Sequence, residues 1–311
     1  MILPCLLLQK PSRNSKAKDH AKKLEERLLL WNDGNIDELL KETEMMQKRF
    51  RSSTKRTADD SARSFAKLVW EGKINPALKM LTKDYENGVL QLDENVLKNL
   101  KSKHPAPAEI KQDSLLFGPI NQLPKSYFDE IDEIMIGKAA SYTKGSGGPS
   151  HVDAEQFRHI LLSKKIKKEG KELREQIAVL AKHLATNLVD PNSIDALTCC
   201  RLIPLNKNPG VRPIGIGEVM RRVIGKTINW ILKEDIQEAA GPLQTATGLK
   251  AGAEAAIHSM RTIFEDPSTE AVILVDASNA FNSLNRKVAL HNIQITCHSF
   301  SYILINTYRN T

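Results

Sequence analysis

The chain has 311 residues, of which 41% are hydrophobic and 26% charged, and its formal net charge is +8. This length and composition predict a globular protein of one large or two smaller domains, with enough chain to bury a core. No stretch approaches the ~18 apolar residues that a membrane span requires. The positive charge favours polyanionic partners, although such an excess is also common in proteins that bind no nucleic acid.

Cysteine usage and the first residues indicate the compartment. The four cysteines form neither a disulfide framework nor a CxxC metal pair, which favours a reducing interior. The opening MILPCLLL contains Pro4, has no basic residues before it and is followed by no small-residue cleavage site. We therefore expect an intracellular protein, in the cytoplasm or nucleus, that is not secreted.

Residues 1–125 are expected to form a helical, basic N-terminal region. Residues 10–56 carry 13 Lys or Arg against eight Asp or Glu, with apolar positions at helical spacing. A solvated helix pair and a dedicated nucleic-acid arm both fit this pattern. Residues 61–82 predict two short helices separated at Gly72, the second beginning at Asn75-Pro76; scaffold is a commoner role for such a pair than DNA reading. Four prolines between residues 101 and 125 mark a domain boundary.

The next segments predict helices followed by a mixed region. Asp153 is placed to cap an amphipathic helix, and residues 171–188 continue as a helix. Residues 201–205 predict a strand, 206–213 a turn, 218–239 one helix that stops at Gly241-Pro242, and 251–264 a small-residue helix. Residues 271–276 (AVILVD) predict a buried strand. The expected fold class is α+β and helix-rich.

Asp276, at the end of that apolar run, is the most informative candidate residue. Ligands of open sheets usually lie at this end of a strand, so Asp276 is a candidate phosphoacceptor, ribose binder or metal ligand. An acid that caps a helix beginning near Ser278 is an equally good interpretation. Phe281 follows five residues later and is either a core residue or a ring over the ligand of Asp276.

Basic residues upstream favour a phosphate ligand. Residues 201–233 hold seven Lys or Arg against one acid. Lys207 and Arg212 flank a Pro-Gly bend and combine a point charge with a bidentate fork, which suits a triphosphate, although solvated loop cations are the default interpretation. Arg221, Arg222 and Lys226 extend the positive surface at helical spacing, as binding to a phosphate backbone requires.

These motifs, in this order, resemble the reverse transcriptases (RNA-directed DNA polymerases) of retroelements such as retrotransposons. GGPSHVDAEQFRHIL resembles the segment that opens the fingers, RLIPLNKNPGVRPIGIGEVMRRVIGK the two finger motifs, and VILVDASNAFNSLN the first palm motif. The resemblance implies that residues 126–311 form a partial reverse transcriptase domain, with fingers and the start of a palm. Residues 1–125 carry none of its motifs.

The resemblance also implies roles for individual residues in two-metal nucleotidyl transfer. Asp276 would be the first catalytic carboxylate and would bind both Mg²⁺ ions, next to the carbonyl of Ala277. Phe281 would lie under the sugar and favour deoxynucleoside triphosphates, while Asn279 and Ala280 would present N–H groups to the triphosphate. Lys207 and Arg212 would hold its outer phosphates. An RNA or DNA template-primer would be the other partner, and no membrane is implied.

The chain departs from the family pattern after Asp276. No Tyr-x-Asp-Asp motif follows, and residues 287–311 contain no Asp or Glu. One carboxylate cannot hold two Mg²⁺ ions, so we expect a truncated reverse transcriptase that does not polymerise DNA by itself. We also expect the apolar run before Asp276 to be partly uncovered, because partner strands of a palm are missing.

Two alternatives remain. The first is a non-catalytic nucleic-acid-binding protein that uses the basic 201–233 surface. The second is a doubly wound enzyme with Asp276 as phosphoacceptor or ribose ligand. The absence of a GxGxxG fingerprint and of alternating βα units in the first 190 residues argues against the second alternative.

Overall fold

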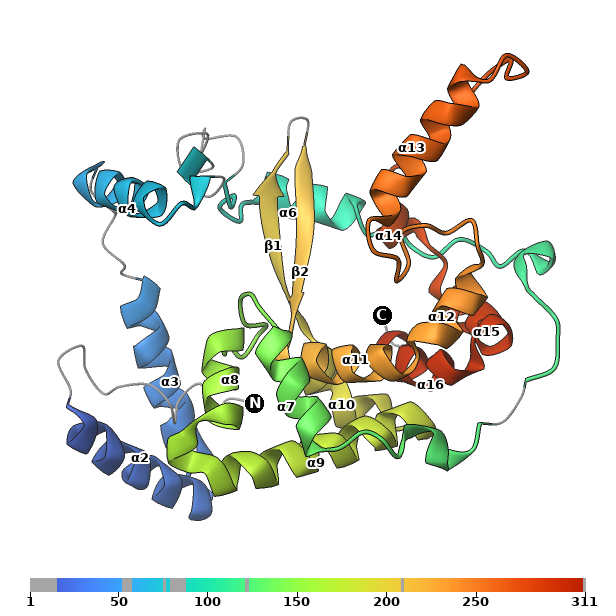
Figure 1. Ribbon diagram of the computed structural model, residues 1–311. Coiled ribbons are helices and arrows are strands. Elements are labelled where there is room, and N and C mark those ends of the chain that lie inside the picture. Colours follow the sequence, from blue (N-terminus) through green and yellow to red (C-terminus); the bar gives the residue numbers. More distant parts are fainter. Residues whose placement is uncertain are drawn as a thin grey trace. The chain divides into compact units, whose positions relative to one another are not determined.

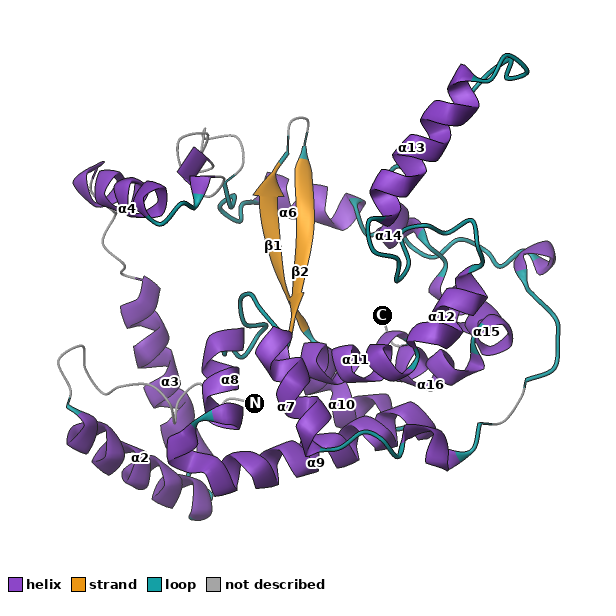
Figure 2. Ribbon diagram, in the orientation of Figure 1, coloured by secondary structure: helices purple, strands orange, loops and turns teal. Residues whose placement is uncertain are grey.

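The computed structural model describes residues 16–51, 58–74, 77–78, 88–120, 123–207 and 210–309. Within these ranges the chain is mostly helical, and one pair of strands forms its only sheet (Figure 1, Figure 2). The expected helix-rich α+β class is confirmed at this level. Among the helices of the described part, none has the length and apolar character needed to cross a membrane.

The chain divides into two compact units that do not follow sequence order. Unit 1 comprises Met1–Leu100, Gly147–Val152 and Arg201–Ile216. Unit 2 comprises Lys101–Ser146, Asp153–Cys200 and Gly217–Thr311. The basic 201–233 segment is therefore shared between the units, with Lys207 and Arg212 in unit 1 and the cations of 221–226 in unit 2.

Unit 1 begins with helices, as the sequence predicts. Helix α2 (Ala17–Asn32) packs on α3 (Ile36–Arg51), and the fully buried Arg27 donates to Glu42 at 2.8 Å between them. Helix α4 (Ala58–Trp70) ends before Gly72, whose φ of 68° suits a helix stop. The second helix expected in this region begins at Asn75-Pro76, outside the described residues.

The two strands of unit 1 form a hairpin. Strand β1 (Cys200–Asn206) agrees with the prediction, but the turn predicted over 206–213 was too long, because strand β2 (Val211–Gly217) already begins at Val211. Val211 is buried against Val96 and Leu100, residues of helix α6 (Glu94–Ser102), and this burial extends the strand. Pro213 is tolerated because β2 pairs with β1 alone in the described chain.

Unit 2 is built around helix α9 (Lys167–Thr186). The α-helices that pack most extensively on it in the described chain are α7 (Glu133–Tyr142), α8 (Ala154–Leu162), α11 (Val219–Ile231) and α16 (His298–Tyr308) (Figure 1). The core between them includes Ile136, Leu161, Ile177, Leu184, Val223, Ile228 and Ile303. Helix α10 (Pro191–Thr198) packs beside α11 and α16.

Capping confirms several predicted helix ends in unit 2 and corrects one helix. The Asp153 carboxylate accepts from the N–H groups of Glu155 and Gln156 at 2.9 and 2.8 Å, so it caps α8 as predicted. The single helix predicted over 218–239 is wrong, because the chain turns at the fully buried Leu232 and continues as α12 (Lys233–Ala240). Gly241, with φ of 76°, ends α12 as predicted.

The last part of unit 2 runs through α13 (Gly252–Glu265), α14 (Ala280–Ser283), α15 (Arg286–Thr296) and α16. Residues 103–118, which we call the strap, lie along α14 and α15 and include a short 3-10 turn, η2 (Gln112–Ser114). The strap lies within the proline-containing segment 101–125, in which the sequence predicts a domain boundary. Its contacts with residues 279–295 join segments about 176 positions apart in the chain.

Tyr127, in the 3-10 turn η3 (Lys125–Phe128), is tied to α12. Its hydroxyl donates to the Asp235 carboxylate at 2.7 Å. Burial raises the pKa of Tyr127 to about 12, with further contributions from the hydrogen bond to Asp235 and then from the negative charge of Asp235. Because the folded pKa lies above that of a free tyrosine, the stabilisation is fully present below a pH of about 10 and is lost as the pH rises through about 12.

We therefore predict that Tyr127→Phe lowers the free energy of unfolding by about 1 kcal/mol at neutral pH, because Asp235 loses a partly buried hydrogen-bond donor. Urea denaturation of the full chain measures this. Tyr142→Phe is the control: Tyr142 is exposed, and its change is expected within about 0.5 kcal/mol. Equal effects of the two substitutions would contradict the prediction. Tyrosinate absorbance checks the raised pKa: the wild type should contain one tyrosine that ionises at a higher pH than any tyrosine of Tyr127→Phe, and the absence of such a tyrosine would also contradict the prediction.

Candidate functional site

Asp276 lies at the end of an exposed, extended segment between α13 and α14. Residues 271–277 belong to no strand, and Ile273, Leu274 and Val275 are 84, 86 and 89% exposed. The predicted buried strand is therefore wrong in both pairing and burial. The apolar run predicts a strand only if other strands supply hydrogen bonds and cover, and the described residues supply neither. The expectation that this run is uncovered agrees with the exposure.

The structure of the turn after Asp276 contradicts the interpretation of Asp276 as a helix cap. The N-cap residue of α14 is Asn279, not Asp276, and the helix begins at Ala280 rather than near Ser278. Asp276 forms no hydrogen bond or ion pair with any residue in the described ranges. Phe281 is 94% exposed, which overturns the interpretation of this ring as a core residue. The carboxylate and the ring are thus both open to a ligand.

Asn279 is the residue of this turn with the most contacts. Its backbone is left-handed (φ 54°, ψ 30°), a conformation that asparagine tolerates better than most residues. Its side-chain amide donates to the Lys103 carbonyl at 2.9 Å and accepts from Asn282 at 3.1 Å. The sequence suggested a role only for the backbone N–H of Asn279, and nothing in it indicated the tie to residue 103.

Lys207 and Arg212 are placed by the β1–β2 hairpin of unit 1. The Lys207 N–H donates to the Gly210 carbonyl at 3.1 Å, and Gly210 has φ of 96°, which closes the hairpin turn. Both basic side chains are exposed, and neither forms an ion pair with a described residue. Their charges are available to a polyanion.

The cations of α11 differ from one another. Arg221 donates to the Thr198 carbonyl at 3.0 Å and to the Cys200 sulfur at 3.5 Å, and its guanidinium lies 5.3 Å from the Tyr308 ring centre. Arg222 donates to the carbonyls of Lys144 and Ser146. Lys226 has no hydrogen-bond or ion-pair partner within the described ranges. Of the three predicted nucleic-acid-binding residues, two therefore bind the protein's own backbone.

Burial changes the electrostatics of Arg222. Desolvation lowers the pKa of its guanidinium, and the nearby Glu218 opposes that effect. An arginine keeps its charge at neutral pH, so this partly buried cation relies on the two carbonyls of the 143–150 loop for solvation. Its Nε atom is buried without a hydrogen-bond partner.

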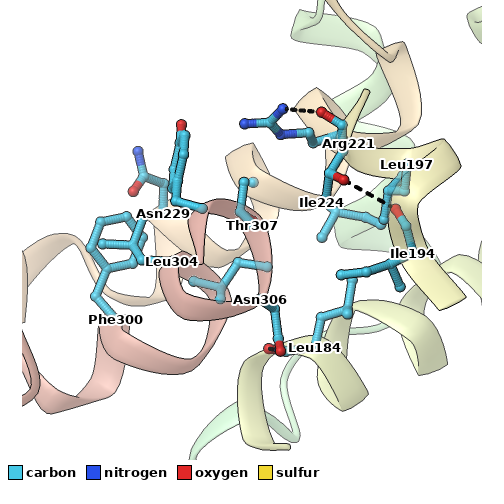
Figure 3. Close-up of a pocket in the computed structure, with 14 residues that line it drawn as sticks. Leu184, Ile194, Leu197, Arg221, Ile224, Asn229, Phe300, Leu304, Asn306 and Thr307 are labelled. Atoms are coloured by element: carbon cyan, nitrogen blue, oxygen red, sulfur yellow. Dashed lines mark hydrogen bonds between the residues drawn. The ribbon is translucent and has the colours of Figure 1, made fainter. Parts of the chain in front are cut away.

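A cavity of about 230 Å³ opens in unit 2 among α9, α10, α11 and α16. Figure 3 shows the Arg221 guanidinium at one edge and Leu184 at the opposite edge. The cavity walls are mainly apolar and include Ile194, Leu197, Ile224, Phe300 and Leu304. Asn306 also lines the cavity, but the Asn306 amide is committed to the backbone of Leu184, Asn187 and Val189.

The described residues do not fit a two-metal centre. Within the described ranges, no three His, Cys, Asp or Glu side chains gather where they can hold a metal ion. Asp276 offers a single carboxylate, whereas two Mg²⁺ ions need several oxygen ligands. These residues alone therefore support no catalytic step through Mg²⁺.

Comparison of the chain with protein-family models, with curated proteins and with solved structures finds no match.

The hydrogen bonds of Arg222 attach α11 to the 143–150 loop. We expect Arg222→Ala to lower the free energy of unfolding by about 2 kcal/mol, because the carbonyls of Lys144 and Ser146 lose a charged donor. Arg222→Lys should restore little of this, since an ammonium group cannot reproduce the planar fork. Urea denaturation measures both. Lys226→Ala is the control on the same helix, with an expected change below about 0.5 kcal/mol; an equal loss of stability in the control would refute the structural role of Arg222.

Proposed function

We propose that residues 126–311 form the fingers and the start of the palm of a retroelement-type reverse transcriptase, an RNA-directed DNA polymerase. The observation that carries the proposal is the order of charged motifs. Lys207 and Arg212 flank a hairpin turn, basic residues of α11 follow, and an apolar run then ends at Asp276 with Phe281 beyond it. The exposure of Lys207, Arg212, Asp276 and Phe281 supports the proposal, because each must reach a ligand.

Under this proposal Lys207 and Arg212 hold the outer phosphates of a deoxynucleoside triphosphate. Ala277, Asn279 and Ala280 contribute backbone groups, and Phe281 lies under the sugar. Lys226 contacts the phosphate backbone of a template-primer, and the commitment of Arg221 and Arg222 to carbonyls reduces their share of that contact.

Under this proposal, Asp276 is only one of the carboxylates that the catalytic centre requires. Mg²⁺ ions held by a complete set of carboxylates would supply Lewis-acid chemistry for nucleotidyl transfer. Asp276 would supply one carboxylate to those ions. Further carboxylates are required, and residues 287–311 contain no Asp or Glu.

We predict that the 311-residue chain does not extend a primer on an RNA or DNA template when deoxynucleoside triphosphates and Mg²⁺ are supplied. Gel analysis of a labelled primer measures this. Primer extension by these 311 residues would contradict the incompleteness of the centre around Asp276. The assignment itself fails if a deoxynucleoside triphosphate with Mg²⁺ changes no amide signal of residues 276–281 in NMR spectra.

The second candidate function is nucleic-acid binding without catalysis, and the uncommitted charges of Lys207, Arg212 and Lys226 favour it. We predict salt-dependent binding of RNA or DNA that requires no Mg²⁺. Replacing Lys207 and Arg212 by alanine should reduce the magnitude of the slope of log affinity against log salt concentration by about 1.4 to 1.8, because each phosphate that is no longer neutralised reduces it by about 0.7 to 0.9. Fluorescence anisotropy with a labelled oligonucleotide measures the slope.

The matched control removes two other exposed lysines, Lys168 and Lys171, which are paired with Glu172 and Glu175 on the same helix. That double variant has the same net charge as Lys207→Ala/Arg212→Ala, and its slope should stay close to that of the wild type. If both double variants had the same slope, the hairpin cations would contribute to binding only through the net charge of the chain.

A further inference from the structure

The strap follows α14 and α15 in the same chain direction. The carbonyls of Lys103, Ala108 and Ser114 accept, in that order, from the side-chain amides of Asn279, Asn285 and Asn292 at 2.9, 2.8 and 2.9 Å. The partners are 176, 177 and 178 positions apart, so the register between the two segments changes by only two residues over the three contacts. The Leu116 N–H adds a hydrogen bond to the Asn292 oxygen at 2.9 Å. Three asparagines thus fasten one continuous segment.

The composition of the strap suits this arrangement. Pro105 and Pro107 have no N–H group and a fixed φ, which disfavours a helix and reduces the entropy lost on ordering. In the three asparagine contacts the strap offers carbonyls, and the asparagines opposite supply the donors. Gly118 lies where an added Cβ would be 2.9 Å from Ile295, so the strap approaches α15 closely at its far end.

Asn279 connects the strap to the turn that carries the candidate site. Its amide binds the Lys103 carbonyl, and its own carbonyl accepts from the N–H groups of Asn282 and Ser283 at 3.1 Å. The same residue is left-handed, which is the bend that takes the chain from the extended segment into α14. Asp276 lies three positions before Asn279, and Phe281 lies two positions after it.

We propose that the strap is a positioning element for the turn between Asp276 and Phe281, and that Asn279 is the positioning residue through which it acts. The amide of Asn279 holds the left-handed bend against the Lys103 carbonyl, and the bend sets the start of α14. The strap, which belongs to the segment in which the sequence predicts a domain boundary, is in this way part of the candidate site. The effect on nucleotide binding rests on the proposed function, whereas the mechanical coupling does not.

Hydrogen exchange in the full chain, followed by NMR, tests the coupling. Asn279→Asp keeps the shape of the side chain but removes the donor to Lys103. We expect the amides of Asn282, Ser283 and Leu284 to exchange about three- to tenfold faster, the effect of losing one ordinary hydrogen bond. Exchange in the second half of α15 should not change. Unchanged exchange at 282–284 would overturn the proposal, and equal acceleration throughout α15 would show general destabilisation instead.

Two matched substitutions isolate the contact. Asn285→Asp removes the donor to Ala108 while leaving an oxygen to cap α15, so exchange at 282–284 should stay within about twofold of the wild type. Lys103→Ala removes a side chain but keeps the accepting carbonyl, and it should also have no effect there. An acceleration by Lys103→Ala equal to that of Asn279→Asp would contradict a role for the carbonyl.

A glycine substitution separates the strap from the backbone bend. Asn279→Gly adopts positive φ freely but has no amide. Positioning by the strap predicts the same acceleration as in Asn279→Asp. Wild-type exchange in Asn279→Gly would mean that the backbone preference alone sets the turn, and the proposal would fail.

A titration with thymidine triphosphate and Mg²⁺ distinguishes failure of this inference from failure of the proposed function. If the nucleotide binds, Asn279→Asp should weaken binding by about the same three- to tenfold, and Asn285→Asp should not. If the wild type shows no change in the amide signals of 276–281, the proposed function fails. The positioning role is still decided by the exchange rates measured without nucleotide.

Discussion

Burial of one face of α9 is the interaction on which unit 2 depends, because helices from four separate parts of the chain meet on it. Ile177, Ala181 and Leu184 are almost fully buried there, and the small side chain between the two large ones lets neighbouring helices approach closely. Helices α7, α8, α11 and α16 gain their positions from this face. The cavity beside α16 and the cations of α11 are consequences of how these helices meet.

Hydrogen bonds from side chains to backbone carbonyls join the packed helices and loops of unit 2. Arg174 donates to the carbonyls of Glu133 and Leu161, Arg222 to those of the 143–150 loop, and Asn306 to those that end α9. Apart from the carbonyl of Glu133, at the start of α7, each of these carbonyls lies in the last turn of a helix or in irregular backbone, where an unpaired buried carbonyl is costly. A basic or amide residue in this chain is therefore often a structural donor, and a count of positive charges overstates the surface available to a polyanion.

The strap and the exposed segment before Asp276 set the character of the candidate site. Asp276 and Phe281 are open to solvent, but the turn between them is attached through Asn279 to a segment that lies far away in the chain. A single exposed carboxylate is a weak metal ligand by itself. What the turn contributes is a fixed local geometry, to which phosphate-binding cations and further carboxylates would have to be added for catalysis.

The sequence by itself determined the features that depend on neighbours along the chain. Asp153 capping α8, Gly72 and Gly241 ending helices, and the strand at 201–205 follow from local hydrogen bonding and side-chain periodicity. The asparagines at 279, 285 and 292 are six and seven positions apart in the sequence, but nothing local indicates their acceptors. Tertiary structure decided the exposure of 271–275, the break at Leu232, the backbone partners of Arg222 and the strap. Each of these depends on contacts between distant residues, and neither periodicity nor composition encodes which distant group a side chain will meet.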